Sequence, residues 1–282
     1  MTRSICLPSR LICRNLMGLV QLALVASLAA ACAAQDGPSL PPSESMTMDL
    51  GGFTAAGEAG KSDDIDTAKK SHFNQAAIRV GWLNTSIVLA LAAPVAVFRA
   101  ALSQQPIFED GSWQWDFSAK SGADLFNAHL KGTFASGARD GDLLDLEMKV
   151  TCTGCKVPTQ DFVWYTGHFL LGDGKGHWQF FDPEIGGSDS QVLRIDYDVT
   201  DAAHRTLTFV NNRTDGHADA GDVIEYKREG DLASVFVHDE SKALDYYAET
   251  SRSTGEGYLQ VPNFNGGEKA CWDGGHHDAP CP

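Results

Sequence analysis

Positive charge is scarce in this sequence. Its 282 residues include 22 Lys and Arg against 37 Asp and Glu, which gives a net charge of −15. A surface this acidic repels the phosphates of nucleic acids and the headgroups of anionic lipids. The composition therefore argues against a nucleic-acid partner and against membrane docking through a basic patch.

Sequence signatures of catalysis and nucleotide binding are also missing. The chain has no G-x-S-x-G elbow, no H-E-x-x-H zinc motif, no P-loop and no G-x-G-x-x-G. We therefore predict no catalytic residue, no metal ligand set and no cofactor. A site assembled from distant strands would leave no such signature, so an enzyme stays open as an alternative.

An apolar run lies close to the start of the chain. Three arginines precede the apolar stretch 16–31, which ends in small residues directly before Cys32. This order is typical of a secretory signal peptide, here residues 1–31. Without these three arginines the chain would hold 19 bases against 37 acids, a net charge of −18.

The residues Leu28-Ala29-Ala30-Ala31-Cys32 resemble the lipobox of bacterial lipoproteins. The resemblance implies cleavage before Cys32 and acylation of that cysteine with fatty acids such as palmitate, which would anchor the chain to a membrane. The leucine lies one position further from the cysteine than the lipobox prefers, so ordinary cleavage after Ala31 or Ala33 stays open. The resemblance also implies sorting to the outer membrane of the cell envelope, because Ala33 rather than aspartate follows the cysteine.

Cysteine numbers fit an oxidising compartment. Cleavage would remove the first two of the seven cysteines and a lipid would occupy Cys32, which leaves an even set of four. Proteins outside the cytoplasm pair such cysteines in disulfides. We therefore expect disulfides among Cys152, Cys155, Cys271 and Cys281.

Each of these cysteine pairs has an alternative interpretation. A disulfide between Cys271 and Cys281 would close the C-terminal tail 266–282, whereas a zinc site would use both thiolates and the two histidines between them. A disulfide between Cys152 and Cys155 would cap a hairpin, whereas their C-x-x-C spacing is also found in redox centres. We favour structural disulfides, because adjacent histidines seldom point the same way and the C-x-x-C ends a predicted strand.

Residues 32–66 have the composition of a flexible tether. Proline, serine and glycine are frequent, and Phe53 is the only aromatic residue. Such a segment has little apolar surface to offset the entropy lost on ordering. We expect it to hold the folded domain away from the anchor at Cys32.

An apolar helix is predicted over residues 67–104. Acidic residues suit its start, and Arg99 lies near its end. The stretch 87–98 is apolar on every side, which predicts a helix surrounded by protein and kinked or interrupted at Pro94. A second membrane span is the alternative, although the run is short for one.

From Gly111 onward the hydrophobic pattern has a period of two. Apolar and polar residues alternate over 113–117, 144–151 and 193–199. Turn sequences separate about ten strands over residues 105–265, and the short links favour an antiparallel meander. One apolar face per strand predicts a mainly β domain, whose curved sheet, half-barrel or barrel packs against the preceding helix.

Aromatic residues are concentrated in the predicted strands. Trp113, Trp115, Trp164 and Trp178 would form either a stacking surface for a ligand or part of the core. With the Cys-Trp-Asp…Cys tail, this layout resembles uncharacterised β-rich lipoproteins of Gram-negative bacteria, a resemblance that implies no activity. A weaker likeness to half-barrel lipoprotein carriers implies an acyl chain held between sheet and helix.

The anchor, the tether and the β-rich domain together predict a lipid-anchored protein of the cell envelope. We expect a non-catalytic binding or interaction role, whose ligand would be an envelope protein, a lipid or a glycan. The alternatives are an envelope hydrolase that cleaves glycans with two carboxylates and a lipid carrier of the half-barrel type. Acid-rich turns such as 215–222 lack the spacing of a calcium loop and are expected to be solvated.

Overall fold

An open antiparallel sheet with one long helix across it makes up most of the structure. The computed structural model describes residues 37–53, 71–122, 124–135, 143–185 and 190–282. Residues 37–282 belong to one unit. The predicted signal peptide 1–31, the lipidation at Cys32, residues 33–36 and 54–66 of the predicted tether and residues 67–70 of the predicted helix lie outside the described part of the chain.

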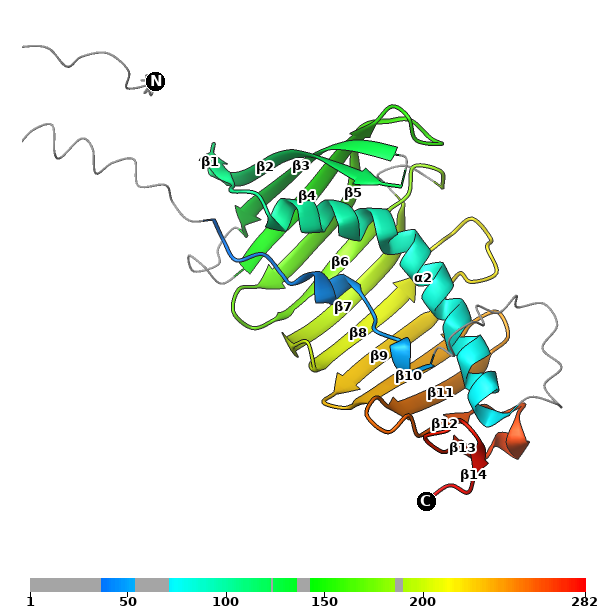
Figure 1. Ribbon diagram of the computed structural model, residues 1–282. Helices are drawn as coiled ribbons and strands as arrows, with labels where there is room; N and C mark the ends of the chain where they lie inside the picture. Colours follow the sequence, from blue (N-terminus) through cyan, green and yellow to red (C-terminus); the bar gives the residue numbers. More distant parts are fainter. Residues whose placement is uncertain (1–36, 54–70, 123, 136–142, 186–189) are drawn as a thin grey trace, which may run out of the picture. The chain divides into compact units, whose positions relative to one another are not determined.

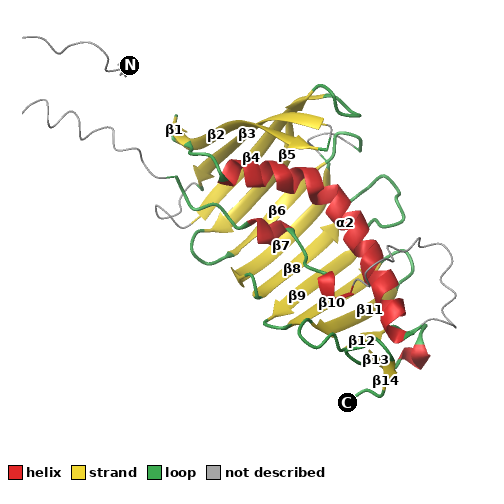
Figure 2. Ribbon diagram, viewed as in Figure 1, coloured by secondary structure: helices red, strands yellow, loops and turns green. Residues whose placement is uncertain are grey.

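Within the described residues, fourteen strands follow one another across the sheet in chain order, each antiparallel to its neighbours (Figures 1 and 2). Their bounds are Ile107–Glu109 (β1), Ser112–Ser121 (β2), Asp124–Phe134 (β3), Leu143–Cys152 (β4), Thr159–Leu170 (β5), Lys175–Phe181 (β6), Gln191–Asp201 (β7), His204–Asn211 (β8), Val223–Glu229 (β9), Leu232–Asp239 (β10), Leu244–Ser251 (β11), Gly257–Gln260 (β12), Ala270–Trp272 (β13) and Asp278–Ala279 (β14). The predicted mainly β meander is confirmed. The sheet has more than the ten strands expected because β1, β13 and β14 are too short to show a period of two.

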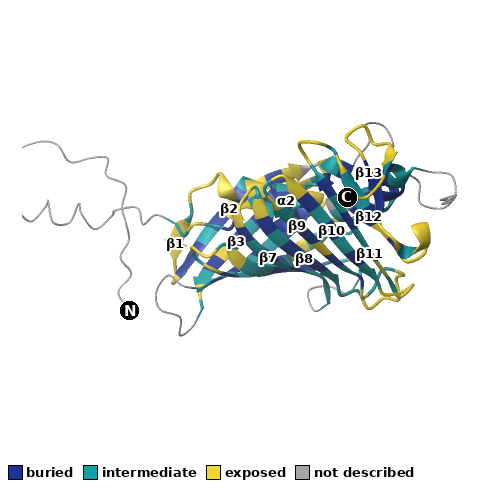
Figure 3. Ribbon diagram, turned by 90° about the horizontal axis from the view of Figure 1, so that it is seen from below, coloured by how far each residue is buried: buried dark blue, intermediate teal, exposed yellow. Residues whose placement is uncertain are grey.

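Alternating side chains decide which face of the sheet is buried. In β4, Leu144, Leu146 and Met148 are buried, and the polar residues between them point to the opposite face. Buried and partly exposed residues alternate in the same way along the other long strands (Figure 3). The apolar faces of all the long strands therefore form one continuous core.

Helix α2 (His72–Leu102) crosses the apolar face of the sheet diagonally (Figure 1). The Ser71 hydroxyl accepts a hydrogen bond from the Asn74 backbone N–H at 3.4 Å and caps the first turn. The helix approaches β2 at one end and β12 and β13 at the other. Pro94 lies inside the helix without ending it, and the helix changes direction part-way along (Figure 2). No helix among the described residues has an apolar stretch long enough to span a bilayer.

Part of the surface of α2 is exposed, which corrects the prediction of a helix surrounded by protein. Leu91, Val95 and Phe98 recur at helical spacing and are buried against the sheet. Ala90 and Ala92 are exposed within the same apolar run. Because alanine adds little apolar area, the run can be hydrophobic at every position and still leave part of the helix surface uncovered.

Residues 37–53, which we call the strap, pack beside α2 on the same face of the sheet (Figure 1). The strap contains two short 3₁₀ helices, η2 (Ser43–Met46) and η3 (Gly51–Phe53), and its Met46 and Phe53 are fully buried. The predicted flexible tether is therefore wrong for residues 37–53. The few apolar side chains of this segment all reach the core of the sheet, so a low apolar content is enough to order it.

Polar contacts also hold the strap on the sheet. The indole N–H of Trp178 donates to the buried Ser45 hydroxyl at 3.0 Å, and this hydroxyl donates to the Pro42 carbonyl at 2.7 Å. Further along, the Asp49 carboxylate pairs with Arg252 and with Arg228. Burial by itself raises the pKa of Asp49, but hydrogen bonds from Arg252 and a backbone N–H, with the charges of both arginines, outweigh burial and lower it.

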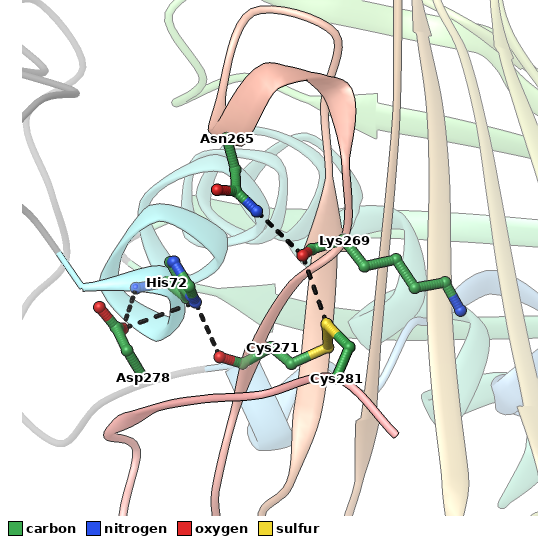
Figure 4. Close-up of a disulfide and its surroundings, with 6 residues drawn as sticks. All are labelled: His72, Asn265, Lys269, Cys271, Asp278 and Cys281. Atoms are coloured by element: carbon green, nitrogen blue, oxygen red, sulfur yellow. Dashed lines mark hydrogen bonds and ion pairs between the residues drawn. A yellow bond between two sulfur atoms is a disulfide. The ribbon is translucent and has the colours of Figure 1, made fainter.

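Disulfides join Cys152 to Cys155 and Cys271 to Cys281, as expected. The second disulfide lies where the start of α2 meets β13 and β14 (Figure 4). There the His72 backbone N–H donates to the Asp278 carboxylate at 2.7 Å, and the His72 Nδ1–H donates to the Cys271 carbonyl at 2.8 Å. The predicted C-terminal tail is thus part of the sheet, and its disulfide holds the surface on which the helix begins.

Candidate functional site

Two adjoining cavities run along the side of α2 that faces away from the strap. Their volumes are about 330 Å³ and about 210 Å³. Both are lined by Ala90 on the helix, Asp182 after β6, and Val192 and Leu193 on β7, so they meet at these residues. We call the two cavities together the groove. Its size lies in the range of small-molecule sites in proteins.

The helix side of the groove is formed by apolar residues one and two turns apart. Leu83, Ile87 and Ala90 line the smaller cavity, whereas Ala90, Leu91 and Pro94 line the larger one. Ala90 is exposed and carries only a methyl group. The space beside α2 therefore exists because a small residue occupies the helix position where both cavities meet.

A β-bulge places an aromatic ring in the opposite wall. Met148 of β4 pairs with Tyr165 of β5, but Lys149 pairs with Val163, so Trp164 is an extra residue in β5. An extra residue in a strand changes the direction in which the neighbouring side chains point. Trp164 lines the larger cavity and stacks on Phe126 of β3, with ring centroids 4.9 Å apart.

A second bulge has the same effect in β7. Phe180 of β6 pairs with Leu193 and Phe181 pairs with Gln191, which leaves Val192 as the extra residue. Val192 and Leu193 both line the groove, although strict alternation would place neighbouring residues on opposite faces. Both bulges thus add apolar side chains to the same wall.

Acidic residues dominate the polar part of the groove lining. The larger cavity includes Asp124, Asp182 and Glu184, and the smaller one includes Asp219 and Asp222. Burial raises the pKa of Asp222, and the charges of neighbouring acids add to this effect. The Asp222 carboxylate also accepts the Glu240 backbone N–H at 3.0 Å, which gives this residue a structural role in the loop.

The two cations that line the groove are both paired with acids. Arg213 binds Asp215 through two hydrogen bonds, Nε to Oδ1 at 3.2 Å and Nη2 to Oδ2 at 2.6 Å. Lys156 Nζ lies 2.7 Å from Glu184 Oε2. Because each cation is already paired with an acid, the other carboxylates of the lining give the groove an excess of negative charge.

Another cavity, of about 550 Å³, lies between the opposite side of α2 and the strap. Ala92 and Val95 of the helix line it together with Met48 and Leu50 of the strap. The strap therefore supplies one wall of this cavity. The groove has the more aromatic walls, with Phe126, Trp164 and neighbouring phenylalanines.

The four tryptophans predicted as a ligand surface separate into two groups. Trp113, Trp115 and Trp178 are at most 4 % exposed and belong to the core, so they offer no surface to a ligand. Trp178, for example, lies edge-on to Phe98 of α2 at 5.2 Å between ring centroids. Trp164 is the member of this set that lines the groove. Sequence alternation could not identify it, because the bulge sets its direction.

Pairs of histidine and aspartate side chains lie on the face of the sheet that points away from α2. His129 Nδ1 lies 2.7 Å from Oδ1 of Asp116, its partner on the neighbouring strand, and His168 lies beside its cross-strand partner Asp145. Burial and the nearby charge of Arg194 lower the pKa of a neighbouring histidine, His177. In the part of the chain that the structure describes, no group of three or more His, Cys, Asp or Glu residues is arranged to hold a metal ion.

No protein-family model matches the chain, and no curated protein or solved structure shows significant similarity to it.

Proposed function

We propose that this is a lipid-anchored protein of the cell envelope that binds an amphiphile and shelters its apolar chain in the groove. The observation that carries the proposal is the apolar space beside α2, which two bulges enlarge with Trp164 and Val192. The proposed role is binding, because the described residues beside α2 form an apolar space that a ligand can occupy.

Burial of an alkyl chain supplies the affinity in this proposal. Each methylene group removed from water contributes about 0.8 kcal/mol, so eight buried methylenes contribute roughly 6 kcal/mol before the cost of association. Stacked Trp164 and Phe126 add a flat, rigid surface for the chain. The groove is therefore suited to a single flexible chain with a polar head at one end.

The envelope location rests on separate features of the chain. Residues 1–31 have the order of a signal peptide, Cys32 ends a lipobox-like sequence, and both disulfides suit an oxidising compartment. If Cys32 carries the anchor, a Cys32→Ala variant will move from the membrane fraction to the soluble fraction. An unchanged distribution between the two fractions would contradict the lipid anchor.

Two alanines on α2 provide a matched test of the groove. Ala90 lines both cavities of the groove, whereas Ala92 lines the cavity beside the strap, and both side chains are exposed. Tryptophan at position 90 would fill the groove, and tryptophan at position 92 would leave it open. We expect Ala90→Trp to weaken binding of the neutral fluorophore N-phenyl-1-naphthylamine at least tenfold, and Ala92→Trp to change it by less than about twofold.

Circular dichroism and thermal unfolding will show whether both variants remain folded. A fluorophore that does not bind the unmodified protein would refute the proposal. Equal binding by the unmodified protein and Ala90→Trp would refute the groove as its site, and a loss confined to Ala92→Trp would place the ligand beside the strap instead.

A further inference from the structure

The charges that line the groove indicate which kind of head a ligand can carry. The loop after β6 contributes Asp182, and the loop between β8 and β9 contributes Asp219 and Asp222. An anionic head placed here would lie next to several carboxylates, and like charges repel. A cationic head would meet charges of opposite sign.

The arginine of the groove does not offset these acids. Arg213 forms a bidentate pair with Asp215, and the charges of Asp182 and Asp219 act on the same guanidinium group. The lysine of the larger cavity, Lys156, is in turn paired with Glu184. An incoming phosphate, sulfate or carboxylate would have to displace one of these pairs to gain a cationic partner.

We propose that the ligand of the groove is an amphiphile whose head carries a positively charged amine, and that the carboxylates of Asp182 and Asp219 select this head over an anionic one. The proposal rests on the proposed function and names the ligand class of the same site. Asp182 and Asp219 are only partly exposed. Their charges are therefore screened by solvent less than those of fully exposed acids.

Three dodecyl compounds with different heads provide the test. Dodecyltrimethylammonium, dodecyl maltoside and dodecyl sulfate share one chain, and each can displace N-phenyl-1-naphthylamine from the mature protein below its micelle concentration. We expect the ammonium compound to bind at least tenfold more tightly than the sulfate, with the maltoside between them. Raising the salt concentration should narrow this difference.

Variants that each remove one negative charge show whether the head preference depends on the acids of the groove or on the net charge of the protein. Asp182→Asn keeps an oxygen acceptor for the Glu184 backbone N–H, which lies 2.7 Å from Asp182 Oδ1. Glu225→Gln removes one charge from an exposed position on β9 that does not line the groove. We expect Asp182→Asn and Asp219→Asn each to reduce the preference for the ammonium head about threefold or more, and Glu225→Gln to leave it unchanged.

The outcomes distinguish the two proposals. If dodecyl sulfate binds as tightly as the ammonium compound, the head preference is wrong and the chain-binding function stands. If Glu225→Gln lowers the preference as much as Asp182→Asn, the preference comes from net charge and the assignment to the groove is overturned. If the fluorophore and all three dodecyl compounds fail to bind, the proposed function itself fails.

Discussion

Gly167 is a position where one added methyl group should disturb the core directly. A Cβ atom at Gly167 would lie 2.5 Å from Cζ3 of the Trp178 ring, which is fully buried. The ring cannot move aside freely, because Phe98 and Tyr165 pack edge-on against it at 5.2 and 5.8 Å. Overpacking of this kind costs about 1–3 kcal/mol. Loss of the buried hydrogen bond from Trp178 to Ser45 adds about 1 kcal/mol or more.

We therefore expect Gly167→Ala to lower the free energy of unfolding by about 2–4 kcal/mol, measured by urea denaturation. Gly132→Ala is the matched control, because Gly132 lies on a nearby strand of the same sheet and its Cβ would lie 3.3 Å from a flexible methyl of Leu146. We expect a loss below about 1.5 kcal/mol there. Equal losses in the two variants would refute the argument that the Trp178 ring is held in place.

Two further predictions concern the contacts that hold the strap and the start of α2. Replacing both Cys271 and Cys281 with alanine should lower the free energy of unfolding by about 2–3 kcal/mol, because the opened loop gains entropy in the unfolded chain. Hydrogen exchange should also increase at the start of α2. An unchanged exchange rate there would contradict the link between this disulfide and the start of the helix. Asp49→Asn should destabilise the protein at neutral pH. The pKa of Asp49 is lower in the folded than in the unfolded protein, so its charge contributes stability above the unfolded pKa. This contribution is lost as the pH falls through the folded pKa. Urea denaturation at several pH values should show the largest difference between variant and unmodified protein near neutrality and a smaller one in acid, and a constant difference would contradict this assignment.

Alternation in the sequence was sufficient to predict most of the sheet. The strand containing Leu144, Leu146 and Met148 follows strict alternation, and its burial in the structure matches the pattern. Short links then implied sequential antiparallel pairing. These features depend on local chemistry and short connections, which a single sequence contains.

The groove wall could not be predicted in the same way. Trp164 and Val192 face the groove because each is the extra residue of a β-bulge. A bulge depends on the pairing register of two strands, and the alternation of one strand does not specify it. The sequence therefore indicates that aromatic residues belong to the sheet, but not which of them line the groove.

The prediction from amino-acid composition is wrong for the strap. Residues 37–53 are rich in proline, serine and glycine, yet Met46, Leu50 and Phe53 are almost fully buried. Average composition treats such a segment as unable to order itself, which is correct for an isolated segment. Here the sheet and α2 supply the apolar surface, so a few well-placed side chains are sufficient.

Fluorescence quenching at Trp164 is the most direct test of the central claim that an alkyl chain lies in the groove. A dodecyltrimethylammonium compound with bromine at the end of its chain should quench part of the tryptophan emission of the mature protein, and a Trp164→Phe variant that still binds the compound should lose most of this quenching. Binding without quenching, or the same quenching in Trp164→Phe, would show that the chain lies elsewhere and would contradict the account.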